Sequence, residues 1–139
     1  PFNKEKILRC GDGDAQENYK IIQNTLQKGM KFDGIFAVND IAAVGALQAL
    51  QAVHISVPQE VAIVGYSDWQ FSSFISPKLT TIRQNGNEMG RKATELLLEE
   101  IHSQDTFIEP KCITLPTKII LRETTLNKQE NNNEHHYCF

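Results

Sequence analysis

An α/β fold with a parallel sheet is predicted by three features of this sequence. Residues 34–38 and 61–66 are short apolar runs of the kind that form buried strands. Stretches with helical periodicity precede and separate these runs, and a further short strand is expected at residues 6–10. The first half therefore reads strand, helix, strand, helix, strand. Such an order requires parallel strands joined by right-handed crossovers.

The first helix is predicted by its start, its period and its end. Residues 11–14, Gly-Asp-Gly-Asp, form a turn cluster that can cap a helix. Apolar positions then recur at helical spacing: Ala15, Tyr19, Ile22 and Leu26. Gly29 suits the turn that ends a helix, because glycine adopts left-handed backbone angles without strain.

The second helix, predicted for residues 41–53, is apolar on nearly every side. Asn39 and Asp40 stand before it, at the junction with the preceding strand. A helix with so little polar surface is buried on more than one side. Because the chain is small, we expect a partner subunit to cover the second side.

The second half of the chain contains one predicted helix and two short strands. Asn85 and Glu88 have the spacing of a helix capping box. The apolar stripe of this helix consists of Met89, Ala93, Leu96, Leu97 and Ile101. Strands are expected at residues 112–115 and 119–121. These elements are too few for a sheet of their own, so we expect them to complete a domain whose remainder lies upstream.

Length and composition are those of one globular domain. The chain has 139 residues, of which 40% are hydrophobic and 22% charged. A formal net charge of −3 without a basic stripe argues against nucleic-acid binding by these residues themselves. Three widely spaced cysteines form no disulfide framework and fit a reducing, cytoplasmic compartment. Residues 127–139 are polar and rich in asparagine, which predicts a disordered tail.

Motifs for catalysis, cofactors and metals are missing from the sequence. It lacks a Gly-x-Ser-x-Gly nucleophile, a phosphate-binding P-loop and a dinucleotide-binding Gly-x-Gly-x-x-Gly. Asp12 and Asp14 lie in a glycine-bearing loop, but the spacing of a calcium loop is absent. We therefore expect neither an enzyme nor a cofactor or metal site.

Polar residues follow two strands that are expected to be neighbours. Asn39-Asp40 comes after residues 34–38, and Ser67-Asp68 comes after residues 61–66. The carboxyl ends of parallel strands meet at one edge of a sheet, where α/β proteins bind ligands. The alternative is that the first pair caps a helix and the second forms a polar turn.

Large apolar residues crowd the loop after the second of these strands. They are Trp69, Phe71, Phe74 and Ile75. Such residues either belong to the core or form a contact surface, which here would be a dimer patch or a place for a sugar ring to stack.

Five segments of the sequence together carry a family pattern. They are FDGIFAVNDIAAVGALQAL at 32–50, VPQEVAIVGYSD at 57–68, PKLTTIRQ at 77–84, MGRKATELLLEEI at 89–101 and LPTKIILRETT at 115–125. In this order and approximate spacing, they resemble the C-terminal part of regulators of the LacI/GalR family.

The resemblance implies a periplasmic-binding-protein-like (type I) core, a three-layer α/β fold with a parallel sheet in each of two subdomains and a ligand in the cleft between them. Residues 1–83 would form the C-terminal effector-binding subdomain. Residues 84–116 would be a crossover helix and strand of an incomplete N-terminal subdomain, and residues 117–126 a return segment. The family's DNA-binding helix-turn-helix lies at the N-terminus of the full protein and is absent from this sequence.

The resemblance also assigns ligand-binding positions. Asn39 matches a ligand-contacting asparagine of the family, and Gln84 matches a crossover position that can face the cleft. Ser67 stands where many members have an aspartate that binds sugar hydroxyls, and Gly13 where some have an aromatic residue. The predicted ligand-binding set is Asn39, Ser67, Asp68, Gln84, Trp69 and Gly13.

A dimer interface is implied in the same way. In the family, the apolar helix at 41–53 and the aromatic loop that follows the next strand lie near the interface between subunits. The predicted interface residues are Val44, Leu47, Phe71, Phe74 and Ile75.

The sequence is therefore predicted to be the effector-binding and dimerisation region of a bacterial DNA-binding transcriptional regulator. Its expected partners are a small sugar-like effector, a second copy of the chain, and operator DNA reached through the missing helix-turn-helix, with no membrane contact. The alternative is the substrate-binding protein of a sugar ABC transporter with the same fold. A helix-turn-helix upstream would favour the regulator, and a signal peptide the transporter.

Overall fold

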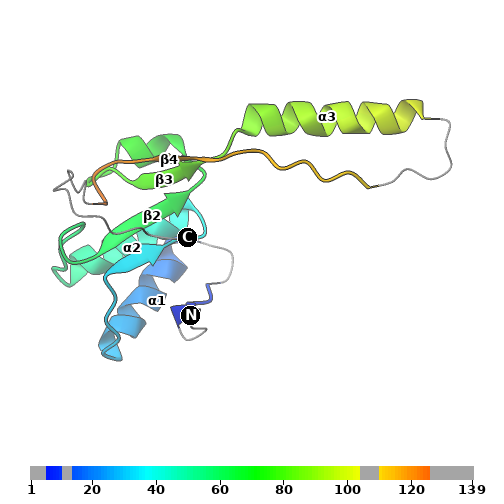
Figure 1. The fold of residues 1–139 in the computed structure, drawn as a ribbon. Coiled ribbons are helices and arrows are strands. Elements are labelled where there is room, and N and C mark those ends of the chain that lie inside the picture. Colours follow the sequence, from blue (N-terminus) through cyan, green and yellow to red (C-terminus); the bar gives the residue numbers. More distant parts are fainter. Residues whose placement is uncertain (1–5, 11–13, 104–109, 126–139) are drawn as a thin grey trace, which may run out of the picture.

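A mostly parallel four-stranded sheet organises the chain in the computed structural model, which describes residues 6–10, 14–103 and 110–125. The strand order is β1-β2-β3-β4. Strands β1 (Gly34–Phe36), β2 (Ala62–Tyr66) and β3 (Thr80–Arg83) run parallel, and β4 (Lys118–Ile120) is antiparallel to β3 (Figure 1). The predicted α/β class is confirmed.

Helix α1 (Ala15–Gln27) begins and ends at the residues that the sequence indicates. The Asp14 side chain caps it by accepting a hydrogen bond from the Gln16 backbone N–H. Gly29 follows the helix with φ +79°, a left-handed conformation that glycine adopts without strain.

Helix α2 (Asp40–Ala52) is buried on two sides by its own chain. One side packs on the sheet, where Leu50, Ile63 and Leu79 are fully buried. The other side packs on α1, and the approach is so close that a Cβ on Gly45 would lie 2.1 Å from the Ala15 carbonyl oxygen. Helix α1 of the same chain therefore covers the side for which a partner subunit was expected.

The sheet has one helix-covered face and one open face within the described residues. Along β2, Ile63 and Gly65 point toward α2 and are buried, while Ala62, Val64 and Tyr66 alternate with them and are only partly covered. On that second face Phe36 is 64% exposed. The three layers expected of the complete fold thus reduce here to a sheet and one helical layer.

Two expected strands are absent. Residues 7–10 and residues 112–115 have no strand conformation. A strand persists only where a neighbouring backbone supplies hydrogen-bond partners. Residues 112–115 lie beyond the end of β3, and β1 has only three residues to offer, so both segments lack a sufficient ladder.

Helix α3 (Gly86–His102) projects away from the sheet beside residues 110–117 (Figure 1). Asn85 caps it by accepting from the Glu88 backbone N–H at 3.2 Å, whereas the Glu88 side chain pairs with Arg91 instead of completing a capping box. None of its residues is buried, and its predicted apolar stripe is largely exposed.

The tail expected at 127–139 lies outside the described residues. Among the helices that are described, none has the length and apolar character needed to cross a membrane.

Replacing Gly45 by alanine tests the close approach of α1 and α2. We expect Gly45→Ala to lower the free energy of unfolding by about 1–3 kcal/mol, because its Cβ collides with backbone atoms of Ala15. The matched control is Gly90→Ala in α3, where a Cβ meets no atom within 4 Å. That change should raise stability by about 0.5–1 kcal/mol through helix propensity. Urea denaturation measures the free energy of unfolding of both variants. Equal changes in the two would contradict the close approach of α1 and α2.

Candidate functional site

The carboxyl ends of the three parallel strands form the edge at which the predicted site residues lie. Asn39 follows β1, Ser67 follows β2 and Gln84 follows β3. The Ser67 backbone N–H donates to the Ile82 carbonyl at 2.8 Å, which ties the end of β2 to the end of β3. The structure therefore brings these three positions to one edge, as the sequence predicts.

A left-handed turn follows β2. Ser67 has φ +113° and Asp68 has φ +53°, angles that non-glycine residues adopt at an energetic cost. Tertiary contacts must therefore maintain the turn. The Asp68 N–H donates to the Thr81 hydroxyl at 3.3 Å, and the Trp69 N–H donates to an Asp40 carboxylate oxygen at 2.7 Å.

Asn39 caps helix α2. Its Oδ1 accepts a hydrogen bond from the Ala42 backbone N–H at 2.7 Å, which confirms the capping alternative. The capping bond uses only the amide oxygen. Within the described part of the chain the Asn39 NH₂ group has no hydrogen-bond partner, so it remains a donor at the sheet edge.

Three further side chains at this edge offer polar groups without partners among the described residues. They are the Ser67 hydroxyl, the Trp69 indole N–H and the Gln84 amide. The Trp69 side chain is 51% exposed and packs edge-on against Phe71, with ring centroids 5.8 Å apart. The unengaged groups of the edge are thus neutral donors and acceptors next to an accessible aromatic ring.

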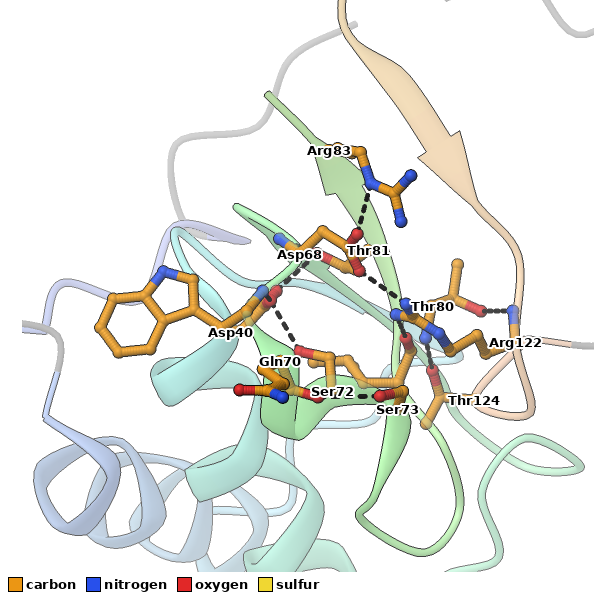
Figure 2. Close-up of polar contacts among 12 residues, drawn as sticks. Asp40, Asp68, Gln70, Ser72, Ser73, Thr80, Thr81, Arg83, Arg122 and Thr124 are labelled. Carbon is orange, nitrogen blue, oxygen red and sulfur yellow. Dashed lines mark hydrogen bonds and ion pairs between the residues drawn. The ribbon is translucent and has the colours of Figure 1, made fainter. Parts of the chain in front are cut away.

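Asp68 is already paired. Its side chain is only 6% exposed, and its two carboxylate oxygens accept from Arg83 Nε and Arg122 Nη2, both at 2.6 Å (Figure 2). Burial raises the pKa of this carboxyl, but the hydrogen bonds and charges of Arg122 and Arg83 outweigh burial and lower the pKa below its ordinary value. The ligand-binding role predicted for Asp68 gains no support from this geometry.

Asp40 is an internal anchor. Its side chain is 1% exposed and accepts from the Trp69 backbone N–H at 2.7 Å, the Ser72 hydroxyl at 2.7 Å and the Thr81 hydroxyl at 2.5 Å (Figure 2). Its position in the first turn of α2 adds the favourable field of a helix N-terminus. Gly65 is required beside it, because a Cβ there would lie 2.3 Å from Asp40 Oδ1.

The predicted interface residues lie in different environments. Phe74 is 77% exposed, while Val44, Phe71 and Ile75 are partly covered. Leu47 is 3% exposed because the core of its own chain surrounds it, which removes the reason for assigning it to an interface. Gly13, predicted to bind ligand, lies outside the described residues.

The segment after β4 supplies residues that the sequence analysis missed. Arg122 reaches Asp68, and Thr124 accepts from the Thr80 N–H and donates to the Ile63 carbonyl. The threonine and arginine residues stand in the quoted runs PKLTTIRQ and LPTKIILRETT, but their partners are more than 40 residues away. Local spacing therefore carries no signal for these contacts.

A groove of about 730 Å³ lies between the two segments that leave the sheet. It is lined by Arg83, Gln84, Asn85, Gly86 and Asn87 on one side and by Pro116, Thr117 and Lys118 on the other. Gln84 is one of the residues that line this groove. No group of three or more metal-ligating side chains occurs among the residues that the structure describes.

Replacing the Asp40 carboxylate tests its anchoring role. Asp40→Asn turns one acceptor into an NH₂ group that faces other donors, so we expect the free energy of unfolding to fall by about 1–3 kcal/mol. The control is Asp33→Asn on the surface, which should cost less than about 0.5 kcal/mol. Urea titrations followed by circular dichroism measure the free energy of unfolding of the two variants. An Asp40→Asn variant as stable as the unchanged chain would contradict the anchoring role of Asp40.

Comparisons with known proteins agree with this architecture. The profile of the periplasmic binding protein-like domain matches residues 3–125. The HTH-type transcriptional repressor PurR of Actinobacillus pleuropneumoniae serotype 3 is 34% identical over 127 residues, which make up 91% of this chain and 38% of PurR. The chain therefore spans little more than a third of that relative's length.

Two solved structures are also similar. A LacI family transcriptional regulator from Enterococcus faecium with bound ribose has a TM-score of 0.67 and 33% identity, over 81% of this chain and 40% of that one. The lac repressor dimer bound to operator and the anti-inducer ONPF has a TM-score of 0.76 and 29% identity, over 84% of this chain and 40% of that one. These relatives are transcriptional regulators, in keeping with the expectation that the chain is not an enzyme. The chain belongs to the periplasmic binding protein-like family, in the form of the effector-binding domain of LacI-family transcriptional regulators.

Proposed function

We propose that this chain is the effector-binding region of a bacterial LacI-family regulator and senses a small sugar-like molecule at the carboxyl edge of its sheet. The observation that supports this is a set of neutral polar groups at that edge that have no partner among the described residues: the Asn39 NH₂, the Ser67 hydroxyl, the Trp69 indole and the Gln84 amide. Amide and hydroxyl groups suit the hydroxyls of a sugar, and the exposed face of Trp69 suits its carbon skeleton.

The carboxylates at the edge argue against a cationic ligand. Asp68 is already paired with both Arg83 and Arg122, and Asp40 is buried behind the turn. A cationic ligand would need an unpaired negative charge to offset its desolvation. The Enterococcus faecium relative holds ribose, which is a neutral sugar.

The rest of the site would come from a second subdomain. We assign residues 1–83 to the C-terminal subdomain, 84–116 to the crossover into the N-terminal subdomain, and 117–126 to the return. The exposed apolar stripe of α3, with Met89, Leu97 and Ile101 at 48%, 55% and 65% exposure, supports an origin in another folded unit. Ligand in the cleft between the subdomains would shift their hinge and reposition operator-binding heads in the cytoplasm.

Asn39→Ser separates ligand binding from helix capping. Serine caps as well as asparagine but lacks the NH₂ donor, so stability should hold while affinity for D-ribose falls about tenfold. Isothermal titration calorimetry measures the affinity, and Asn24→Ser on the exposed side of α1 serves as control. Unchanged affinity would remove Asn39 from the site. Absence of heat with ribose and with a panel of other mono- and disaccharides would overturn the sugar proposal.

We further propose that Val44, Phe71, Phe74 and Ile75 belong to a homodimer interface, as the dimeric lac repressor suggests. Phe74 is 77% exposed, more than any other large apolar side chain of the described residues, so it is available to a partner. Phe74→Asp should shift sedimentation velocity profiles toward monomer, because it buries an unpaired charge in the interface. Gln70→Asp, which adds the same charge in the short helix η2 (Gln70–Ser73) that immediately precedes Phe74, should not shift them. Identical profiles for all three proteins would exclude the loop.

A further inference from the structure

Asp68 joins the turn after β2 to both segments that leave the sheet. Arg83 is the last residue of β3, from which the chain departs toward α3. Arg122 lies shortly after β4, on which the chain returns. Both guanidinium groups converge on the one carboxylate at 2.6 Å (Figure 2). A single side chain of the candidate ligand loop therefore contacts the outgoing and the returning connection.

Arg122 is the firmer of the two partners. Its side chain is 15% exposed, against 55% for Arg83. Its Nη1 also donates to the Leu79 carbonyl at 2.8 Å, and its backbone N–H donates to the Thr80 hydroxyl at 2.8 Å. An arginine held at its backbone by Thr80 and at its guanidinium by Leu79 loses less entropy on binding Asp68 than a free surface arginine would.

The turn needs such a support. Ser67 and Asp68 both have left-handed backbone angles, which cost energy unless surrounding contacts maintain them. Backbone hydrogen bonds hold the turn at Ile82, Thr81 and Asp40. Among the described contacts, Asp68 is the only residue of the turn whose side chain is held by hydrogen bonds.

We propose that Arg122 is a positioning residue of the ligand site: through Asp68 it holds the turn 67–69 in the conformation that presents the Ser67 hydroxyl and the Trp69 indole. The effect on ligand rests on the proposed function, whereas the effect on the turn does not. Because coupling between sites is reciprocal, a ligand that engages this turn also stabilises the position of the return segment.

The chain contains its own control for this proposal. Lys78 and Glu123 form a second ion pair between the β3 side and the return segment, with N–O distance 3.3 Å. Their side chains are 54% and 53% exposed, so solvent screens the pair and it contributes little. Glu123→Gln therefore removes a charge next to Arg122 without touching the turn.

Trp69 reports on the turn directly, because it is the only tryptophan of the 139 residues. The experiment compares acrylamide quenching of its fluorescence in the unchanged chain, in the single variants Arg122→Gln, Arg122→Lys, Asp68→Asn and Glu123→Gln, and in the double variant with Asp68→Asn and Arg122→Gln. Asparagine tolerates left-handed backbone angles, so Asp68→Asn isolates the loss of the carboxylate. Far-UV circular dichroism verifies that each variant is folded.

We expect Arg122→Gln and Asp68→Asn to raise the quenching constant by a similar factor, and the double variant to raise it no further. The quenching constant of Arg122→Lys should lie between those of the unchanged chain and Arg122→Gln, because lysine keeps the charge but lacks the forked donors of a guanidinium. Glu123→Gln should match the unchanged chain. Urea titration should show an about tenfold smaller folding equilibrium constant for Arg122→Gln. If Arg122→Gln does not fold, the quenching constants of Arg122→Lys and Asp68→Asn test the role of Arg122 in the turn.

Two results would overturn the proposal. One is a quenching constant equal to that of the unchanged chain in folded Arg122→Gln or Asp68→Asn. The other is a quenching constant that rises as much in Glu123→Gln as in those two variants. A calorimetric titration with D-ribose then separates the two proposals. Weaker binding by Arg122→Gln supports the positioning of the ligand site, and unchanged binding by a variant with raised quenching refutes it. Should the unchanged chain bind no sugar at all, the proposed function fails, while the quenching data still decide the role of Arg122 in the turn.

Discussion

The fold of this chain depends on one buried carboxylate. Asp40, 1% exposed, accepts hydrogen bonds from Trp69, Ser72 and Thr81, and so joins the start of α2 to the loop after β2 and to β3. No cation neutralises it within the described contacts; three donors and the N-terminus of α2 do so instead. A buried carboxylate that loses a hydrogen-bond donor costs free energy. The start of α2, the loop after β2 and β3 must therefore keep the relative positions in which all three donors reach Asp40. Asp40 therefore ties these three segments together at the edge of the sheet.

The same edge separates charged groups from neutral ones. Its carboxylates serve the protein: Asp40 holds the loop from within, and Asp68 is occupied by two arginines from the connecting segments. Neutral amide, hydroxyl and indole groups are left to face outward. The ion pair between Asp68 and Arg122 also joins the return segment after β4 to a loop more than 50 residues before it.

Apolar helices occupy two contrasting environments in this chain. In helix α2, Gly45 allows close backbone contact with α1, so most of a helix that lacks a polar face is buried within its own chain. Helix α3 has a clear apolar stripe and none of its residues is buried. The period of apolar residues thus identifies which side of a helix is to be covered, but it does not identify what covers it.

The sequence by itself determined the α/β class, the positions of α1, α2 and α3, the caps at Asp14, Asn39 and Asn85, and the strand ends at which the candidate site lies. All of these follow from local periodicity and short-range hydrogen bonds. Only the tertiary structure decided that α1 covers α2, that residues 7–10 and 112–115 form no strand, and that Asp68 faces Arg83 and Arg122. Those outcomes depend on pairings between segments as many as 54 residues apart, and no local pattern records which distant donor will reach a given carboxylate.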